Sequence, residues 1–290
     1  MEMENQAAAQ KPAILFDYDR WSERLPALAQ TYWTNQPYPH LHLENFLEQG
    51  VARRLMEEFP EPDSHAWIQY KHQNENKMGL PKREMFPQRI GQVVDELNSP
   101  EFLAWLTELT GIEGLVSDAT LEGGGLHQSS RGGFLNVHAD FTMHHHNRNW
   151  RRRLNLILYL NEGWQAEWGG AIELWDREMA RCVARVLPLL NHALIFNTDE
   201  NSFHGFPDRL SCPEGTSRKS LALYYYTPEV RVTGPGRSTN YRARPSDGLV
   251  QAALIWADKQ AVNLYSRLKE TFGLSDDFAS RVLGFFARKK

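Results

Sequence analysis

His138 and Asp140 are side chains suited to binding a metal ion, and they stand two residues apart. The surrounding stretch, 134–141, reads as a β-strand, on which side chains two apart share a face, with Cα atoms about 6.6 Å apart. A second histidine from a later strand would complete a set of two histidines and one carboxylate, and His204 is the natural candidate. This set leaves three positions open on the metal, as is typical of non-haem iron(II) sites.

The spacing of His138 and Asp140 is a weak signal by itself, because eleven histidines make an accidental match common. His42 and Glu44 form a rival pair of histidine and carboxylate, but they lie at the edge of a predicted helical region with no β-rich block after them. For His138 the alternative is a hydrogen-bonded core histidine beside a charged aspartate. The residues around each pair must therefore decide between these interpretations.

Arg218 is suited to the co-substrate that such a metal needs. A 2-oxo acid that chelates iron has a far carboxylate that must be held inside the protein, and arginine offers a planar pair of donors for it. Arg218 begins a strongly β-like stretch fourteen residues after His204. Ser220 shares its face by alternation, so its hydroxyl could join the same carboxylate. The alternative for Arg218 is a surface charge at a strand end.

The predicted strand 153–161 has two unlike faces. Leucines occupy alternate positions from 154 to 160, which favours packing against helices. Asn155 and Tyr159 lie on the other face, which indicates either the lining of a pocket or a face turned to solvent. Arg152 belongs to a triplet of arginines, 151–153, at the start of this strand. The triplet is interpreted either as solvated surface or as a cationic rim that receives an anionic group of the substrate.

The composition is that of an ordinary globular protein, with 290 residues of which 41% are hydrophobic and 23% charged. A net charge of -4 gives no general attraction to nucleic acid or to anionic lipid. The two cysteines form no CxxC pair, which excludes a disulfide scaffold or zinc finger and favours a cytoplasmic location. The sequence predicts neither a signal peptide nor a membrane span.

The pattern along the chain changes twice. Helices are predicted over 21–32, 43–59 and 90–109, the last broken near Ser99 and Pro100 and ended by Gly111. From about 121 to 232, short β-like runs alternate with turn residues, as in a β-sandwich or barrel. A helical pattern returns from 247. We expect one integrated domain with an N-terminal helical support region (1–120), a catalytic β core (121–232) and a C-terminal helical extension (233–290).

Five blocks of this sequence resemble a known family in their order and approximate spacing. They read RGGFLNVHADF, RRRLNLILYLNEGW, WGGAIELW, LIFNTDENSFHGFP and SRKSLALYYYTPE. The resemblance is to the prolyl-4-hydroxylase-like branch of the 2-oxoglutarate/Fe(II)-dependent dioxygenases, especially to bacterial members that hydroxylate small molecules or peptides. It covers about residues 121–229. It implies an α+β fold with a mainly β core, a double-stranded β-helix (jelly roll) flanked by N- and C-terminal helices.

The resemblance also implies roles for individual residues. It places iron(II) on His138, Asp140 and His204. It places 2-oxoglutarate on four further residues, namely Arg218, Tyr159, Ser220 and Asn155. It places the substrate near Arg152 and Gln128, although some members carry a tyrosine where this chain has Gln128.

The activity that the resemblance implies is hydroxylation of an unactivated C–H bond in a small molecule, a proline-like amino acid or a peptide. Oxygen and 2-oxoglutarate would be consumed, succinate and CO2 released, and ascorbate would be a possible reductant. Asp140 favours hydroxylation, because related halogenases replace this carboxylate by a small residue. The alternatives are a nucleic-acid demethylase of the same fold and a non-enzymatic jelly-roll binding module. No nucleic-acid or membrane partner is expected, and the C-terminal helices suit either a monomer or a homodimer.

Overall fold

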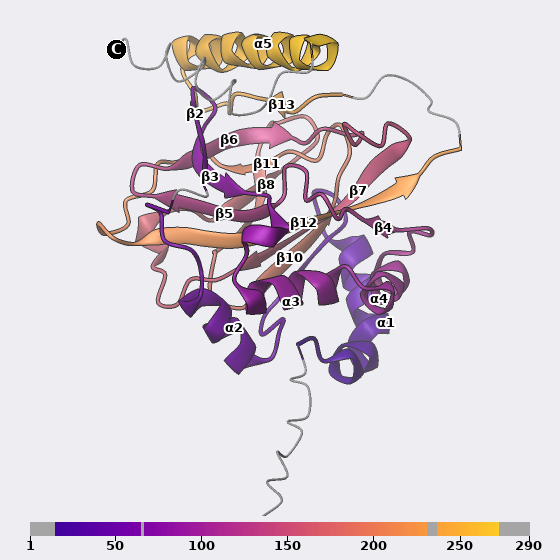
Figure 1. Ribbon diagram of the computed structural model, residues 1–290. Helices are drawn as coiled ribbons and strands as arrows, with labels where there is room; N and C mark the ends of the chain where they lie inside the picture. The colour runs from indigo at the N-terminus through magenta and orange to yellow at the C-terminus, as the bar shows by residue number, and fades with distance from the viewer. Residues whose placement is uncertain (1–14, 65–66, 231–236, 273–290) are drawn as a thin grey trace, which may run out of the picture.

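An antiparallel sheet of thirteen described strands curls into a nearly closed barrel with helices on its flanks (Figure 1). The computed structural model describes residues 15–64, 67–230 and 237–272. The strands are β1 (His40–Leu43), β2 (Ile68–His72), β3 (Glu75–Leu80), β4 (Val116–Ser117), β5 (Gly125–Ser130), β6 (Phe134–Ala139), β7 (Trp150–Tyr159), β8 (Ile172–Trp175), β9 (Cys182–Val186), β10 (His192–Asn197), β11 (His204–Phe206), β12 (Ser217–Pro228) and β13 (Asn240–Tyr241).

The strands follow the order β1-β10-β7-β12-β5-β3-β6-β11-β8-β9, while β13, β2 and β4 pair at the sides with β6, β3 and β12. The helices are α1 (Tyr18–Thr34), α2 (Gln49–Glu57), α3 (Gln88–Leu97), α4 (Pro100–Thr110) and α5 (Leu249–Phe272), with short 3-10 turns at Arg83–Met85 and Ala166–Trp168. The predicted fold class, a jelly-roll-like β core flanked by helices, is therefore confirmed.

The N-terminal helices begin and end at residues with the expected capping chemistry. The Asp17 carboxylate accepts a hydrogen bond from the Arg20 backbone N–H at 3.1 Å at the start of α1. Ser99 caps α4, Pro100 follows at the first helical position, and Gly111 ends the helix at φ 64°. The break and the end predicted for the stretch 90–109 are therefore confirmed.

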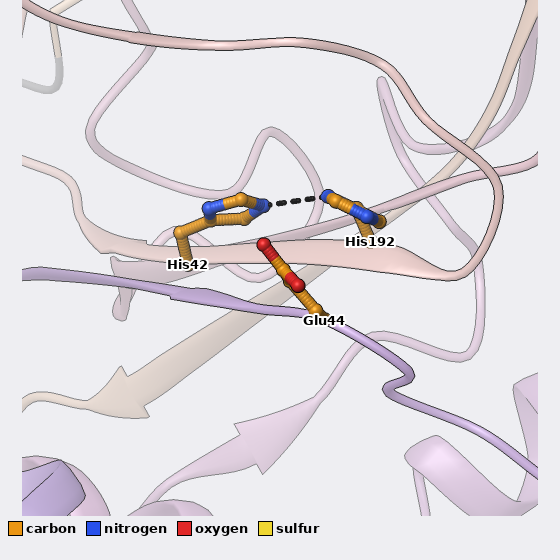
Figure 2. A group of neighbouring side chains, drawn as sticks. All are labelled: His42, Glu44 and His192. Atoms are coloured by element: carbon orange, nitrogen blue, oxygen red, sulfur yellow. Dashed lines mark hydrogen bonds between the residues drawn. The ribbon is translucent and has the colours of Figure 1, made fainter.

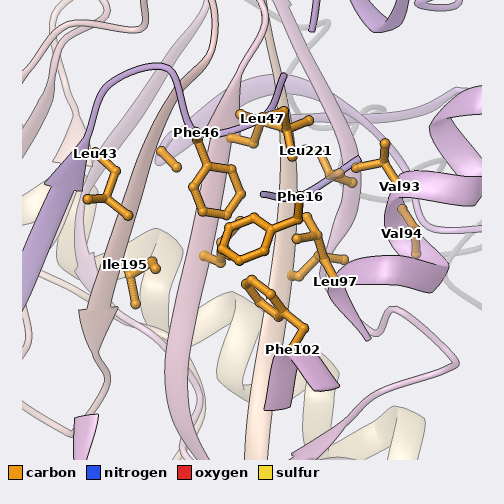
Figure 3. Close-up of a cluster of buried hydrophobic side chains, with 14 of the residues drawn as sticks. Phe16, Leu43, Phe46, Leu47, Val93, Val94, Leu97, Phe102, Ile195 and Leu221 are labelled. Atoms are coloured by element: carbon orange, nitrogen blue, oxygen red, sulfur yellow. The ribbon is translucent and has the colours of Figure 1, made fainter. Parts of the chain in front are cut away.

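The main hydrophobic core lies between these helices and one face of the sheet. Leu154, Leu156 and Leu158 of β7 are fully buried in it, so the leucine face predicted from the sequence does pack against helices. Figure 3 shows part of this core, with Phe16 beside Phe102. Because alternate side chains of a strand point to opposite faces, the other residues of β7 are turned toward the interior of the barrel.

Four strands of the N-terminal region 1–120, namely β1 to β4, were not expected. The predicted helix 43–59 is shorter in the structure, since Leu43 belongs to β1, Asn45 adopts φ 54° and α2 begins only at Gln49. The hairpin β2–β3 also lies in the region predicted as helical support, yet β3 pairs with both β5 and β6. The barrel therefore includes residues outside the segment 121–232 that was predicted as its core.

α5 crosses the barrel on the side away from α1–α4 (Figure 1). It is attached to the hairpin, because the Asn74 side chain donates to the Ile255 carbonyl at 3.2 Å and His72 contacts Asp258 at 2.7 Å. The end of the predicted extension, 273–290, lies outside the described residues. Within the described ranges, no helix combines the length and apolar character needed to cross a membrane.

Candidate metal centre

Three potential metal ligands meet inside the barrel. His138 lies near the end of β6, and Asp140 follows directly after that strand. His204 is the first residue of the neighbouring strand β11, where it pairs with His138. One potential ligand atom from each residue lies within 4.8 Å of the other two. The Asp140 carboxylate oxygens are 3.5 Å from Nε2 of each histidine. The structure thus brings together the three residues that the sequence proposed as metal ligands.

Both imidazoles are oriented by the backbone in the same way. Nδ1 of His138 lies 2.9 Å from the Asn136 carbonyl oxygen, and Nδ1 of His204 lies 2.9 Å from the Ser202 carbonyl oxygen. A carbonyl only accepts, so Nδ1 carries the proton and Nε2 keeps its lone pair for a metal. Burial also lowers the pKa of His204 to about 4, which keeps this ring neutral at pH 7.

Asp140 is held by two residues of β7. Asn155 donates to its Oδ2 at 2.7 Å, and Nη2 of Arg152 lies 3.0 Å from the same oxygen. Burial opposes ionisation of this carboxyl, but the positive charge of Arg152 and the two neighbouring histidines together outweigh it and hold the pKa of Asp140 well below its usual range. The carboxylate is therefore charged and fixed toward the histidines.

Arg152 does not lie on the solvated surface, which corrects one interpretation of the arginine triplet. Its side chain is 1% exposed, and its guanidinium stacks 3.4 Å from the centroid of the Tyr224 ring. Its Nε donates to Asn155 Oδ1 at 2.8 Å, so these two residues fix each other as well as Asp140. Three consecutive arginines at a strand start suggest solvent, and strict alternation would place Arg152 on the leucine face. The register of β7 with β12 shifts between Tyr225 and Tyr226, next to Arg152, and this bulge turns its side chain inward.

Arg218 and the three potential ligands line one cavity of about 240 Å3. The Arg218 side chain is buried, its Nε donates to the Gly170 carbonyl at 2.8 Å, and its guanidinium lies 4.2 Å from the Phe206 ring centroid. Among the described residues it has no carboxylate partner. Burial accordingly lowers its pKa. A buried cation without a counter-ion is suited to an anionic ligand.

Gly170 explains how Arg218 is positioned. It adopts φ 78°, and a Cβ there would lie 2.7 Å from Leu210 Cδ2 and 3.1 Å from Arg218 Cδ. Glycine therefore allows the backbone to pass beside the arginine stem and to turn its carbonyl toward Nε.

Of the remaining residues proposed from the sequence, two line the cavity and two do not. Ser220 and Asn155 line the cavity. Tyr159 is fully buried beside Arg218, whose guanidinium lies 5.0 Å from its ring centroid, and the Tyr159 hydroxyl has no hydrogen-bond partner among the described residues. Gln128 does not line the cavity, because its amide faces the other way and accepts from Ser217 Oγ at 2.5 Å.

The sequence analysis missed several cavity residues. His127, next to Gln128 on β5, faces the cavity, and burial together with the charge of Lys77 lowers its pKa to about 3. β3 contributes Lys77 and Glu75, which form an ion pair of 3.2 Å. Tyr241 of β13 also lines the cavity, with its ring centroid 5.4 Å from that of His138. All of these residues lie on strands that the sequence did not predict, although β5 with His127 falls within the predicted β-rich region 121–232.

Comparisons with known proteins agree with this geometry. Residues 124–226 match the family model described as "2OG-Fe(II) oxygenase superfamily". A mouse protein named Prolyl 3-hydroxylase OGFOD1 is 25% identical over 220 residues, which are 73% of this chain and 37% of that protein. The chain thus spans about a third of the length of this curated relative.

Two solved structures share the fold. A crystal structure of a Pseudomonas putida prolyl-4-hydroxylase has a TM-score of 0.51 and 19% identity, over 70% of this chain and all of that one. A prolyl hydroxylase from Trichoplax adhaerens, solved in complex with a hypoxia inducible factor oxygen degradation domain peptide, has a TM-score of 0.50 and 14% identity, over 72% of this chain and 93% of that one.

Proposed function

We propose that the chain is an iron(II)- and 2-oxoglutarate-dependent dioxygenase of the 2OG-Fe(II) oxygenase superfamily, whose family model matches residues 124–226. Its reaction would be hydroxylation of an unactivated C–H bond in a small molecule, a proline-like amino acid or a peptide. One observation carries the proposal, namely that His138, Asp140 and His204 converge on a cavity that also holds a buried arginine without a counter-ion.

The residues present fit both of the groups that this activity requires. Two imidazoles and one carboxylate are the donor set of iron(II) oxygenases, and Nε2 of each imidazole faces the Asp140 carboxylate at 3.5 Å. Arg218 lacks a carboxylate, and the buried hydroxyl of Tyr159 beside it lacks a partner. A bound dicarboxylate would give the Arg218 guanidinium a counter-ion and the Tyr159 hydroxyl a hydrogen-bond acceptor.

Each of these residues then has a distinct task. His138, Asp140 and His204 would hold iron(II), while Arg218 with Tyr159 and Ser220 would hold the far carboxylate of 2-oxoglutarate. When bound, iron(II) and 2-oxoglutarate supply the oxidising power, with O2 consumed and succinate and CO2 released. The barrel walls keep water from the reacting centre.

Arg152 and Asn155 would act through Asp140, which they keep ionised and oriented. The aromatic lining, with Tyr70, Tyr224 and Tyr241, offers flat apolar faces to a substrate ring.

A prolyl peptide is the substrate class that we favour. The mouse relative is named a prolyl hydroxylase. Arg152 also lines a second hollow of about 700 Å3. This hollow offers space for the residues that flank the proline of a peptide substrate. Four more arginines line that hollow, namely Arg151, Arg153, Arg177 and Arg237. Three of them pair with carboxylates, whereas Arg153 has no ion pair among the described residues, so acidic peptides should bind best.

The decisive experiment adds iron(II) and then 2-oxoglutarate to metal-free protein without oxygen and records the visible charge-transfer band of the chelate. The wild type is expected to show the band. Asp140→Ala and His204→Ala should lose it, and Arg218→Ala should need a roughly 100-fold higher concentration of 2-oxoglutarate, because about 3 kcal/mol of charge-assisted hydrogen bonding is removed. Arg148→Ala, at an exposed arginine, is the matched control. Absence of the band from folded wild type would favour a binding module instead.

The substrate class is tested by succinate release with free proline, a neutral prolyl peptide and an acidic prolyl peptide. We expect the acidic peptide to be turned over best. Arg153→Glu should raise its KM roughly fivefold without changing turnover of a neutral peptide, and Arg148→Glu should change neither. Stimulation by free proline alone would redirect the proposal to an amino-acid hydroxylase.

A further inference from the structure

A second group of potential metal ligands lies outside the central cavity. His42 belongs to β1, Glu44 follows directly after it, and His192 begins β10. One potential ligand atom from each lies within 4.8 Å of the others. Figure 2 shows the two imidazoles edge to edge, with the Glu44 carboxylate pointing toward them. His42 and Glu44 carried little weight in the sequence because they lie at the edge of a predicted helical region with no β-rich block after them. Their third member, His192, is 148 positions beyond Glu44, and only the sheet brings it near.

The pairing of β1 with β10 places the three side chains on one face. His42 stands opposite Leu194 and Leu43 opposite Ala193, in antiparallel register. Leu43 points into the main core, so its neighbours His42 and Glu44 point to the other side. Continuing the register brings Glu44 level with His192. Unlike the core leucines, His42 and Glu44 are exposed and open to an ion from solvent.

The backbone on both sides of this group is anchored. Asn191, immediately before His192, accepts from the Phe46 backbone N–H at 3.0 Å through its carbonyl. Its side-chain oxygen accepts from the Leu47 backbone N–H at 2.8 Å, and its side-chain amide donates to the Leu47 carbonyl at 2.9 Å. Asn191 thus fixes the chain just after Glu44 against the chain just before His192. Ligands held by a fixed backbone need little reorganisation to bind a metal.

The two imidazoles already stand close to the separation that a metal requires. Nε2 of His42 and Nδ1 of His192 are 2.9 Å apart, joined by a hydrogen bond. Two nitrogens at about 2.0 Å from a tetrahedral zinc ion are about 3.3 Å apart, so a shift of a few tenths of an ångström would admit the ion. The proton between the two nitrogens would be released to solvent on binding.

We propose that His42, Glu44 and His192 form a second metal site, which binds a divalent transition-metal ion of the zinc type. Imidazole ligands favour zinc, nickel and copper over magnesium or calcium, which prefer oxygen. Three protein ligands leave a fourth position to water. This site is separate from the proposed iron centre, because His192 and Phe196 lie four residues apart on β10, about 13 Å along a strand, and it is Phe196 that packs against His204, at 4.7 Å.

The bound ion would stabilise the edge strand β1. β1 is the terminal strand of the sheet order and pairs only with β10 along that path. Two ligands come from β1 and its continuation, and one comes from β10, so the ion would cross-link the two strands. Ions that bind only the folded state stabilise it.

The test is zinc stoichiometry after equilibrium dialysis, with metal measured by mass spectrometry. Wild type is expected to bind two ions, His42→Ala/His192→Ala one, and Asp140→Ala/His204→Ala one. His146→Ala, at an exposed histidine outside both groups, is the control and should bind two. Glu44→Gln should weaken the outer site roughly tenfold. The chelate band of His42→Ala/His192→Ala should stay intact, which would show that this variant folds.

A second readout isolates the outer site. In the Asp140→Ala/His204→Ala background, zinc should raise Tm by a few degrees, and magnesium should not. Adding His42→Ala/His192→Ala should abolish this rise. The proposal is overturned if the outer variant binds as many zinc ions as wild type, or if zinc leaves Tm of the Asp140→Ala/His204→Ala protein unchanged. Neither result depends on whether the central cavity works as an oxygenase.

Discussion

Tyr159 is the residue at which an effect on the free energy of unfolding can best be separated from an effect on 2-oxoglutarate binding. Its hydroxyl is buried and without a partner among the described residues, so the folded chain gains nothing from it. Tyr159→Phe should leave the free energy of unfolding within about 0.5 kcal/mol of wild type, yet raise Kd for 2-oxoglutarate roughly tenfold. Denaturant titration and the chelate band measure the two quantities.

Tyr226→Phe provides a matched control for that variant. Tyr226 is equally buried and its hydroxyl is also without a partner among the described residues, but its ring lies beside His144 and Trp150 rather than beside Arg218. We expect no change in 2-oxoglutarate affinity. Equal weakening by both variants would mean that Tyr159 acts through packing rather than through its hydroxyl.

At this scale, residue type and spacing predicted which side chains would meet, but not always which way they would face. His138 and Asp140 were predictable because alternation on a strand is local. His204 and Arg218 needed the additional assumption that later strands return to the same cavity. Gln128 was predicted to face the substrate and lies on the opposite face of β5 from His127, and a displacement of one residue is enough to cause this.

The pairing of β6 with β11 is the element on which the candidate metal centre depends. Gly205 follows His204 in β11, and a Cβ there would lie 2.8 Å from the Leu135 carbonyl oxygen and 2.9 Å from that of Asn136. Gly205→Ala should therefore push β11 away from β6 and weaken iron binding more than tenfold in anaerobic titration. Gly248→Ala, where a Cβ meets nothing within 4 Å, should bind iron as wild type does.

The contact of hairpin β2–β3 with α5 should depend on pH through His72. Burial alone would lower the pKa of His72, but its hydrogen bonds with Asp258 and Glu75 outweigh burial and raise the pKa to about 9. Because the pKa of His72 is higher in the folded chain than its unfolded value of about 6.5, protonation of His72 stabilises the fold fully below about pH 6.5. This contribution to stability is lost as pH rises through about 9.

His72→Gln should therefore be less stable than wild type by on the order of 2 kcal/mol at pH 6 and about equally stable at pH 10. Denaturant unfolding across this range measures the difference, and Asp258→Asn should reproduce much of it. A difference that stays constant with pH would show that His72 contributes by packing alone.

The strands β1, β2 and β3 mark where element prediction failed. β2 and β3 are short, and the alternation of β3 is masked because several of its residues are buried on both faces. β3 pairs with β5 and β6 through residues 46 to 60 positions apart, and no local pattern reports such a contact. The central strands were predictable because β-branched and aromatic runs recur between turn residues.

For the whole molecule, ligand binding should appear as added stability. If iron(II) and 2-oxoglutarate bind only the folded chain, a concentration one hundred times Kd adds about 2.7 kcal/mol, which raises Tm by roughly 5–10 °C. Anaerobic thermal unfolding measures the rise, and removal of the metal by a chelator should reverse it. His204→Ala combined with His42→Ala/His192→Ala should show no rise, and a rise in that variant would place the binding elsewhere.

The cavity is built from two parts of the chain, and this has an evolutionary consequence. The family-matched segment 124–226 supplies His138, Asp140, His204 and Arg218, whereas the hairpin and β13, outside that segment, supply Glu75, Lys77 and Tyr241. Side-chain changes on the hairpin can alter which substrate fits while the residues of the candidate metal centre stay the same, so paralogues of this chain should diverge first along residues 68–80.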